Sequence, residues 1–189
     1  LIDFQWYSGF AISQKQKSIK SLHEKAMIKG YHNLLEVSTR SPELIGQRLS
    51  AFSLEIDTKT YGKISVECAF QGSKVFEGNI QYNEIYSKTS LEAKKFHKLN
   101  PSGKLIGFKF EEEEWELEPK SAFYDWLYIK ALHPHKDYLK KLFKYDAFTD
   151  IEFNPSKSIN CQARTCAIII SLLKRDLYDE VMSSKENFI

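Results

Sequence analysis

The sequence predicts a helix-rich α+β fold with a small β component, in one domain that spans residues 1–189. The chain is long enough for one domain with a substantial core, and it contains no internal repeat, low-complexity tract or Pro/Gly/Ser-rich linker. Hydrophobic residues make up 42% of it, which is typical of a globular protein rather than a disordered one. Helical caps and stripes recur along the chain, whereas segments with strand character are few and short.

Caps and apolar stripes place the predicted helices. Ser13 begins the spacing of a capping box, so the first helix is expected from about Gln14 to Ile28. Thr89 and Glu92 frame a second capping box ahead of another helix. Further helices are expected over 121–132, 135–145 and 159–175, the last with Ser158 as its cap.

Three short segments have the β-branched and apolar composition of strands: Leu34–Val37, Ser50–Ile56 and Lys104–Phe110. The four glutamates that follow, Glu111–Glu114, are expected to form a solvated turn. The sheet component is therefore predicted to be small.

The segment ISVECAFQGSKVF, residues 64–76, is apolar except for a glutamate, a glutamine and a lysine. On a single helix, Glu67, Gln71 and Lys74 fall within roughly 60° of one another, and apolar residues cover the rest of the circumference. A helix that is apolar nearly all round is a buried helix. The polar stripe is therefore predicted to face a functional cleft, with a tertiary ion-pair network as the alternative.

Two other segments concentrate polar groups. Lys15 and Lys17, with Ser13 before them, form a basic surface at the start of the first helix, which suits phosphates, although a solvated helix face is the alternative. Further along, polar side chains gather between the last loop and the start of the last helix, and local capping does not explain so many of them. These are Asn154, Lys157, Asn160, Gln162 and Arg164.

Composition excludes several classes of function. The longest apolar run is too short to span a bilayer, so no membrane association is expected. The net charge of +2 neither demands nor excludes nucleic acid. Three cysteines without framework spacing suggest reduced thiols in a cytoplasmic protein. Metal-binding spacings and Gly-rich phosphate loops are not found, so neither a metal nor a cofactor is expected.

The stretch 49–76 resembles the signature of the NADAR superfamily, named for its association with NAD and ADP-ribose. Leu49, Ser50 and Phe52 match the first element, with Ala51 where asparagine is usual, and Gly62 matches a turn. The matching positions in the helical element are Glu67, Phe70, Gln71 and Lys74, and Asn160 matches in the closing helix. The family's tryptophan-glycine pair is replaced by FTDIEFNP, where Asp150 is the acidic equivalent.

The segments 5–23 and 148–164 look more specifically like the branch of NADAR antitoxins paired with DarT toxins, with residues 1–30 as a basic extension of that branch. This resemblance implies a metal-independent ADP-ribosyl glycohydrolase that removes ADP-ribose from guanine bases of single-stranded DNA and counteracts a DarT-type toxin. It implies Glu67, Lys74 and Asp150 as catalytic residues. Substrate-binding roles are implied for Ser13, Lys15, Lys17, Ser50, Phe52, Phe70, Gln71, Asn154, Asn160, Gln162 and Arg164.

Two other functions stay open. Relatives outside the branch are N-glycosidases, so the substrate is alternatively a small phosphorylated metabolite of the riboflavin-pathway type. The chain is alternatively a non-catalytic module that binds ADP-ribose. The presence of both Glu67 and Lys74 favours catalysis, because a pure binder does not need both. The basic N-terminal segment favours a substrate larger than a metabolite.

Overall fold

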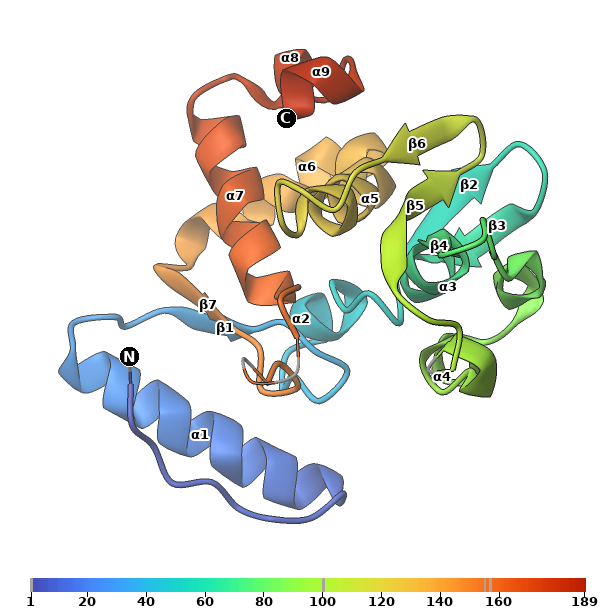
Figure 1. Cartoon of the computed structure of the whole chain (residues 1–189). Helices are drawn as coiled ribbons and strands as arrows, with labels where there is room; N and C mark the ends of the chain where they lie inside the picture. Colours follow the sequence, from blue (N-terminus) through green and yellow to red (C-terminus); the bar gives the residue numbers. More distant parts are fainter. Residues whose placement is uncertain (1, 100, 155, 157) are drawn as a thin grey trace. The chain divides into compact units, whose positions relative to one another are not determined.

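The computed structural model describes residues 2–99, 101–154, 156 and 158–189 (Figure 1). Helices account for 46% of the chain and strands for 15%, in three small sheets, which confirms the helix-rich α+β class. The chain forms two compact units, described here separately. Unit 1 comprises Leu1–Ser50 and His135–Tyr178, and unit 2 comprises Ala51–Pro134 and Asp179–Ile189. A single domain over 1–189 stays a prediction.

Unit 1 contains a parallel pair of strands and a long N-terminal helix. Its helices are α1 (Ile12–Ile28), α2 (Leu44–Arg48), α6 (Lys136–Leu139) and α7 (Gln162–Lys174), with a 3-10 turn over Lys140–Lys144. Strands β1 (Leu34–Glu36) and β7 (Ala147–Thr149) pair in parallel, with Glu36 opposite Thr149. The N-terminal segment runs along α1 (Figure 1), where the Tyr7 N–H donates to Ser18 Oγ at 2.9 Å.

Unit 2 surrounds one buried helix, α5 (Ala122–Leu132). Its other helices are α3 (Val66–Gly72), α4 (Ser90–Lys94) and α9 (Lys185–Phe188), with 3-10 turns over Asn83–Ser87 and His97–Leu99. Its strands are β2 (Glu55–Thr58), β3 (Gly62–Ser65), β4 (Lys74–Phe76), β5 (Leu105–Phe110) and β6 (Glu113–Trp115). Strands β2 and β3 form a hairpin, and β4, β5 and β6 form an antiparallel sheet in that order. Helix α8 (Tyr178–Val181) and the 3-10 turn His133–His135 lie where the two units join in sequence.

Aromatic side chains fill the core of unit 2. All residues from Phe123 to Ile129 in α5 are buried, as expected for a helix that is apolar all round. The Phe123 ring lies 4.7 Å from that of Phe108 in β5, and Trp126 lies 4.9 Å from Trp115 in β6, measured between ring centroids. These rings join the helix to the three-stranded sheet.

The prediction of one helix over 64–76 is wrong. Ile64 belongs to β3, opposite Ile56, and the helix begins only after Ser65, whose Oγ accepts the Cys68 N–H at 3.1 Å. The helix ends at Gly72, and the Ser73 carbonyl then accepts the Lys109 N–H from the end of β5. Residue 74 is therefore on a strand, because pairing with β5 satisfies its backbone and the helix does not continue.

Three predicted boundaries are also wrong. Helix α1 begins at Ile12 with Ala11 as its N-cap, so Ser13 is inside the first turn and does not cap it. Ser158 does not cap α7, which begins at Gln162 after Cys161. The strand expected at Ser50–Ile56 begins only at Glu55, because the preceding turn offers its carbonyls to the first N–H groups of α3. The capping box of Thr89 and Glu92 is confirmed.

Candidate functional site

Glu67 is a buried acid at the start of α3, with 7% of its surface exposed. Its own N–H donates to the Ala51 carbonyl at 3.2 Å, which ties the start of the helix to the turn before β2. Its Oε1 accepts a hydrogen bond from Gln71 Nε2 at 2.9 Å. The helix therefore supplies both the carboxyl group and the amide that orients it.

Burial raises the pKa of Glu67 above its ordinary value, because desolvation disfavours the carboxylate. The hydrogen bond from Gln71 and the positive charges of Lys94 and Lys74 act in the opposite direction and do not cancel the shift. A carboxyl group held in this way keeps its proton to higher pH than an exposed glutamate. It is suited to donate that proton to a leaving group.

Lys74 reaches the same region from β4, where it is paired with Phe108 of β5. Its Nζ lies 5.2 Å from the centroid of the Phe70 ring, within the range of a cation–π contact. Burial lowers the pKa of Lys74, and the nearby Glu67 charge raises it by less. The amine is therefore more readily deprotonated than an exposed lysine, which is the condition for a nucleophilic amine.

Phe70 forms the apolar side of this group of residues. Its ring centroid lies 5.4 Å from that of Phe108 and 5.3 Å, edge to face, from that of Tyr124. These rings exclude water from one side of Lys74, which is the physical cause of the desolvation. The predicted residues Glu67, Phe70, Gln71 and Lys74 thus lie together in unit 2, although not on one helix.

Lys94 is a residue that the sequence analysis missed. It ends α4, its Nζ lies 5.1 Å from the centroid of the Phe52 ring, and its charge lowers the pKa of Glu67. Nothing in the sequence distinguishes Lys94 from its lysine neighbours on an exposed helix. Phe52, in contrast, was predicted from the signature, and it is half-buried.

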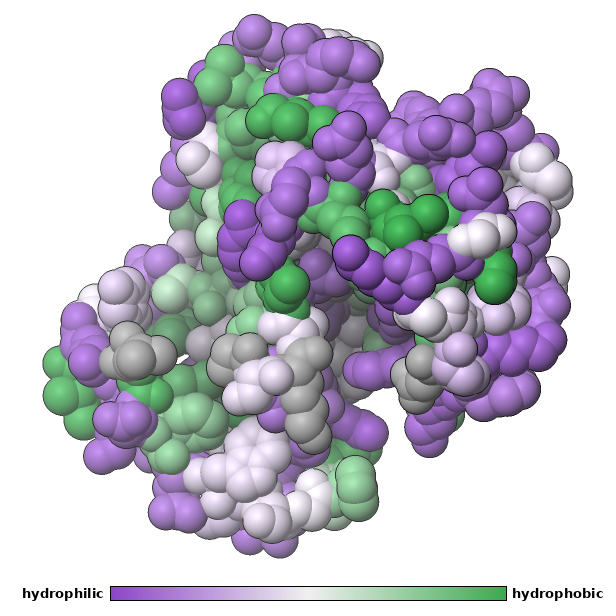
Figure 2. Space-filling view, viewed as in Figure 1, coloured by the Kyte–Doolittle hydropathy of each residue, from purple (hydrophilic) through white to green (hydrophobic). Residues whose placement is uncertain are grey.

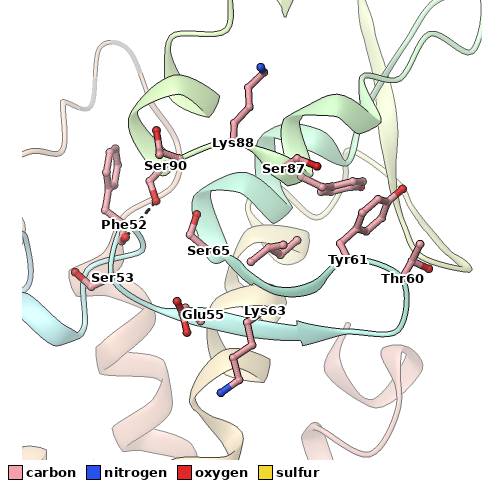
Figure 3. A pocket seen from close by; sticks show the side chains of 13 residues that line it. Phe52, Ser53, Glu55, Thr60, Tyr61, Lys63, Ser65, Ser87, Lys88 and Ser90 are labelled. Atoms are coloured by element: carbon pink, nitrogen blue, oxygen red, sulfur yellow. Dashed lines mark hydrogen bonds between the residues drawn. The ribbon is translucent and has the colours of Figure 1, made fainter.

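A groove of about 720 Å³ lies beside this region, between the β2–β3 hairpin and the segment before α4 (Figure 3). Phe52 lines one end of it and Tyr61 the other. A second cavity of about 240 Å³ shares Tyr61 with the first. Glu67, Gln71 and Lys74 are not among the described residues that line either one. The candidate catalytic groups therefore lie next to the groove rather than on its walls.

Asp150 lies in unit 1, directly after β7. Its Oδ2 accepts from the backbone N–H and from Nε2 of Gln162, both at 3.3 Å, and its Oδ1 accepts from the Glu152 N–H at 3.1 Å. Desolvation, followed by the charge of Glu36, raises the pKa of Asp150 to about 6. The structure therefore brings together the predicted Asp150 and Gln162.

Glu36 is a second buried acid of unit 1 that the sequence analysis missed. Its Oε1 accepts from Ser38 Oγ at 2.6 Å and from the Ile151 N–H at 2.8 Å, and its Oε2 accepts from Thr149 Oγ1 at 2.6 Å. His23 Nε2 lies 2.9 Å from the same hydroxyl. What marks Glu36 in the sequence is that it is the acidic residue of the otherwise apolar strand LLEV. The hydrogen bonds of Glu36 with Thr149 and Ile151 hold the chain on both sides of Asp150.

The other predicted binding residues of unit 1 are more dispersed. Lys15 forms an ion pair with Glu152 at 3.5 Å, and its Nζ lies 4.6 Å from the Trp6 ring centroid. Asn154 Oδ1 accepts the Ser156 N–H at 2.9 Å. Ser13, Lys17 and Arg164 are exposed, Asn160 is half-buried and Ser50 is buried. Lys157 lies outside the described residues.

Comparison with known proteins identifies the family. A family model described as a DarT1-associated NADAR antitoxin matches residues 1–189, which is the whole chain. The chain belongs to this family of NADAR antitoxins. The match spans both compact units, so it includes Glu67 and Asp150 alike. No curated protein matches the chain.

Two further properties of this NADAR antitoxin are read from its described residues. None of its described helices has the length and apolar character needed to cross a membrane. Within the same residues, no group of three or more His, Cys, Asp or Glu side chains is arranged to hold a metal ion.

Proposed function

We propose that this antitoxin is an ADP-ribosyl glycohydrolase that releases ADP-ribose from guanine bases of single-stranded DNA and so reverses the modification made by a DarT1 toxin. The observation that carries the proposal is a buried acid close to a half-buried amine, each within the electrostatic influence of the other. Glu67 has a raised pKa and Lys74 a lowered one, and each shift is caused mainly by desolvation. A general acid and a nucleophilic amine are two groups that together can cleave a glycosidic C–N bond.

The first half of the reaction forms a covalent intermediate. The neutral Lys74 amine attacks the anomeric carbon of the ribose, while the bond from that carbon to the guanine nitrogen breaks and Glu67 gives its proton to the departing nitrogen. The carboxylate that remains stabilises the positive charge on the ribose. In the lysine-bound sugar, the bond between the anomeric carbon and the ring oxygen then breaks. One of the two amine protons passes to that oxygen, and an open-chain protonated imine forms.

The second half restores the enzyme. The Glu67 carboxylate takes a proton from water, and the hydroxide that remains adds to the carbon of the protonated imine. The carbon–nitrogen bond to Lys74 then breaks while the proton of the new hydroxyl group passes to the departing amine, and the open sugar closes its ring again. The products are unmodified guanine in the DNA strand and free ADP-ribose, so one water molecule is consumed per turnover. The proposed role of Gln71 is to hold the Glu67 carboxylate through the bond between their side chains and to contact the ribose hydroxyls.

The remaining predicted residues are proposed to bind substrate, with Phe52 and Phe70 on the ribose and base. Roles in substrate binding are proposed as well for the predicted residues of unit 1. These are Ser13, Lys15, Lys17, Ser50, Asn154, Asn160, Gln162 and Arg164. Asp150 is proposed as a further acid of the reaction, supported by its pKa of about 6.

The test is incubation of the protein with an oligonucleotide that carries ADP-ribosylated guanine, with free ADP-ribose measured by chromatography. Wild-type protein should release ADP-ribose, and Glu67→Gln should slow release by roughly 10²–10⁴-fold, because the acid is lost while the shape is kept. Glu116→Gln, at an exposed position of unit 2, is the matched control and should keep the wild-type rate.

Other results would support the alternatives. Turnover of a small phosphorylated glycosylamine without release from DNA would identify a metabolite N-glycosidase. Tight binding of ADP-ribose without turnover of either substrate would identify a binding module.

A further inference from the structure

The groove between the β2–β3 hairpin and the segment before α4 is lined mainly by polar groups. Hydroxyl side chains come from both of its walls, and these are Ser53, Thr60, Ser65, Ser87, Thr89 and Ser90. Figure 3 shows Ser65 and Ser87 between Phe52 at one end and Tyr61 at the other. Hydroxyl groups both donate and accept hydrogen bonds, so this lining suits a polar ligand rather than an apolar one.

The two walls of the groove are held together by hydrogen bonds. Cys68 Sγ, in α3, donates to the Lys88 carbonyl at 3.0 Å, and Ser90 Oγ donates to the Phe52 carbonyl at 3.1 Å. Ser65 lines the groove and also caps α3. The groove is therefore formed before a ligand arrives, which lowers the entropy cost of binding.

Tyr61 presents a supported aromatic ring at one end of the groove. It is 38% exposed, and its ring centroid lies 4.5 Å from that of Tyr86. The Tyr86 ring is buried, and its hydroxyl lies 3.2 Å from Ser73 Oγ and 3.2 Å from Gln81 Nε2. Tyr61 therefore offers an exposed aromatic face that the buried Tyr86 ring supports from behind. Nucleobases stack on exposed aromatic side chains of this kind.

Lysines flank the groove on opposite sides. Lys88 and Lys63 extend outward from its two walls (Figure 3). Beyond Tyr61, Lys59 is paired with Glu112 at 3.7 Å, so the charge that counts at the groove is that of Lys63 and Lys88. Glu55 is the acid among the lining residues of the groove. The surface around the hairpin, at the upper right of Figure 2, is mainly hydrophilic. Positive charge on both sides of a polar groove favours a ligand with repeated negative charges.

The other end of the groove adjoins the proposed catalytic acid. Phe52 lines this end, and the Lys94 that acts on Glu67 lies over its ring. Ser65 is also two residues before Glu67 in the chain. One part of a polymer bound in the groove therefore lies close to the site of the proposed reaction.

We infer that this groove binds a stretch of single-stranded nucleic acid next to the modified base. One base of the strand stacks on Tyr61, and its phosphates contact Lys63 and Lys88. The identification of this strand as the substrate rests on the proposed function, but binding of the strand does not.

The binding test uses an unmodified, fluorescein-labelled single-stranded oligodeoxynucleotide and fluorescence anisotropy with the full chain. Tyr61→Ala should weaken binding at least about 5-fold, because base stacking on an aromatic ring is lost. Lys88→Ala should reduce the slope of log affinity against log salt by about 0.7, because one phosphate contact is lost. Exposed Tyr31→Ala and Lys120→Ala are the matched controls and should bind as wild type. A duplex of the same sequence should compete poorly, because its bases are already stacked.

A second measurement separates this inference from the proposed function. The ratio of kcat/KM for an ADP-ribosylated oligonucleotide to that for ADP-ribosylated guanosine should fall at least about 5-fold in Tyr61→Ala. An equal loss of kcat/KM for the oligonucleotide and for ADP-ribosylated guanosine would overturn the inference. Strand binding that is unchanged in Tyr61→Ala and in Lys88→Ala would overturn it as well. Tyr61-dependent binding without any release of ADP-ribose would keep the inference and reject the proposed function. Release of ADP-ribose from guanosine without any strand binding would reject the inference and keep the proposed N-glycosidic cleavage.

Discussion

Gln71 Nε2 donates a 2.9 Å hydrogen bond to Oε1 of Glu67, one turn earlier in α3. This bond opposes the effect of burial, because a donor to the carboxylate stabilises its charged form. Gln71 therefore offsets part of the increase that burial causes in the pKa of Glu67.

Replacing Gln71 by leucine should raise the pKa of Glu67 further, since burial then acts without the amide donor. If protonated Glu67 is the acid, release of ADP-ribose falls as pH rises through this pKa. The alkaline limb of the pH–rate profile should therefore move to higher pH in Gln71→Leu. Gln5→Leu, at an exposed position in unit 1, should leave the profile unchanged. A limb that stays in place would mean that Glu67 does not supply the proton.

Lys74→Arg should be nearly inactive although the positive charge is kept. A guanidinium with a pKa above 12 is not a nucleophile, whereas burial lowers the pKa of the Lys74 amine. Borohydride added during turnover should reduce the imine and leave an ADP-ribose adduct on Lys74, detected by mass spectrometry of peptides. Lys104→Arg, on an exposed lysine of unit 2, is the control. Substantial activity in Lys74→Arg without an adduct would show that Lys74 only attracts the substrate.

Asp150 should make the protein less stable as pH rises from about 4 to about 6. Its pKa is raised to about 6 in the folded chain, so the folded state keeps its proton over a range where the unfolded chain has lost it. Below the pKa of Asp150 in the unfolded chain, about 4, its contribution to stability is fully present and is on the order of 2–3 kcal/mol. This contribution is lost once the pH has risen to the pKa in the folded chain, about 6.

Urea unfolding of Asp150→Asn at pH 4, 5 and 6.5 tests this. In the variant, the free energy of unfolding should fall less with rising pH, because the share caused by Asp150 is absent. The share caused by the buried Glu36, whose pKa is raised too, should remain. Exposed Asp57→Asn should follow the wild type at each pH. An Asp150→Asn curve parallel to wild type would contradict the raised pKa.

Gly72→Ala should destabilise the chain by about 1–3 kcal/mol, although alanine is the better helix former. A Cβ at residue 72 would lie 2.6 Å from the Tyr86 ring, which is buried and held by hydrogen bonds, so it has little room to move. Urea unfolding measures the loss. In the Tyr86→Leu background the same change should cost less, because the ring is absent. An equal cost in both backgrounds would show that the ring is not the cause.

Local patterns were sufficient where a few neighbouring residues decide the structure. The capping box of Thr89 and Glu92 fixes the start of α4, and the helix expected over 121–132 is present as α5. Glu67, Gln71 and Lys74 were selected because polar groups in an apolar segment are costly unless they have a role. The periodicity of that segment was misread, because a helix and two strand ends of similar composition look alike over short stretches.

Residue patterns along the chain were enough to predict the fold class, the family signature and the candidates Glu67, Gln71 and Lys74. Only the tertiary structure decided that Lys74 comes from a strand paired with β5. It also showed that Lys94 acts on Glu67, and that Glu36 forms a network behind Asp150. The physical reason is that burial and pairing depend on residues distant in sequence. A pKa shift of a buried group is set by what surrounds it in space, which local composition does not specify.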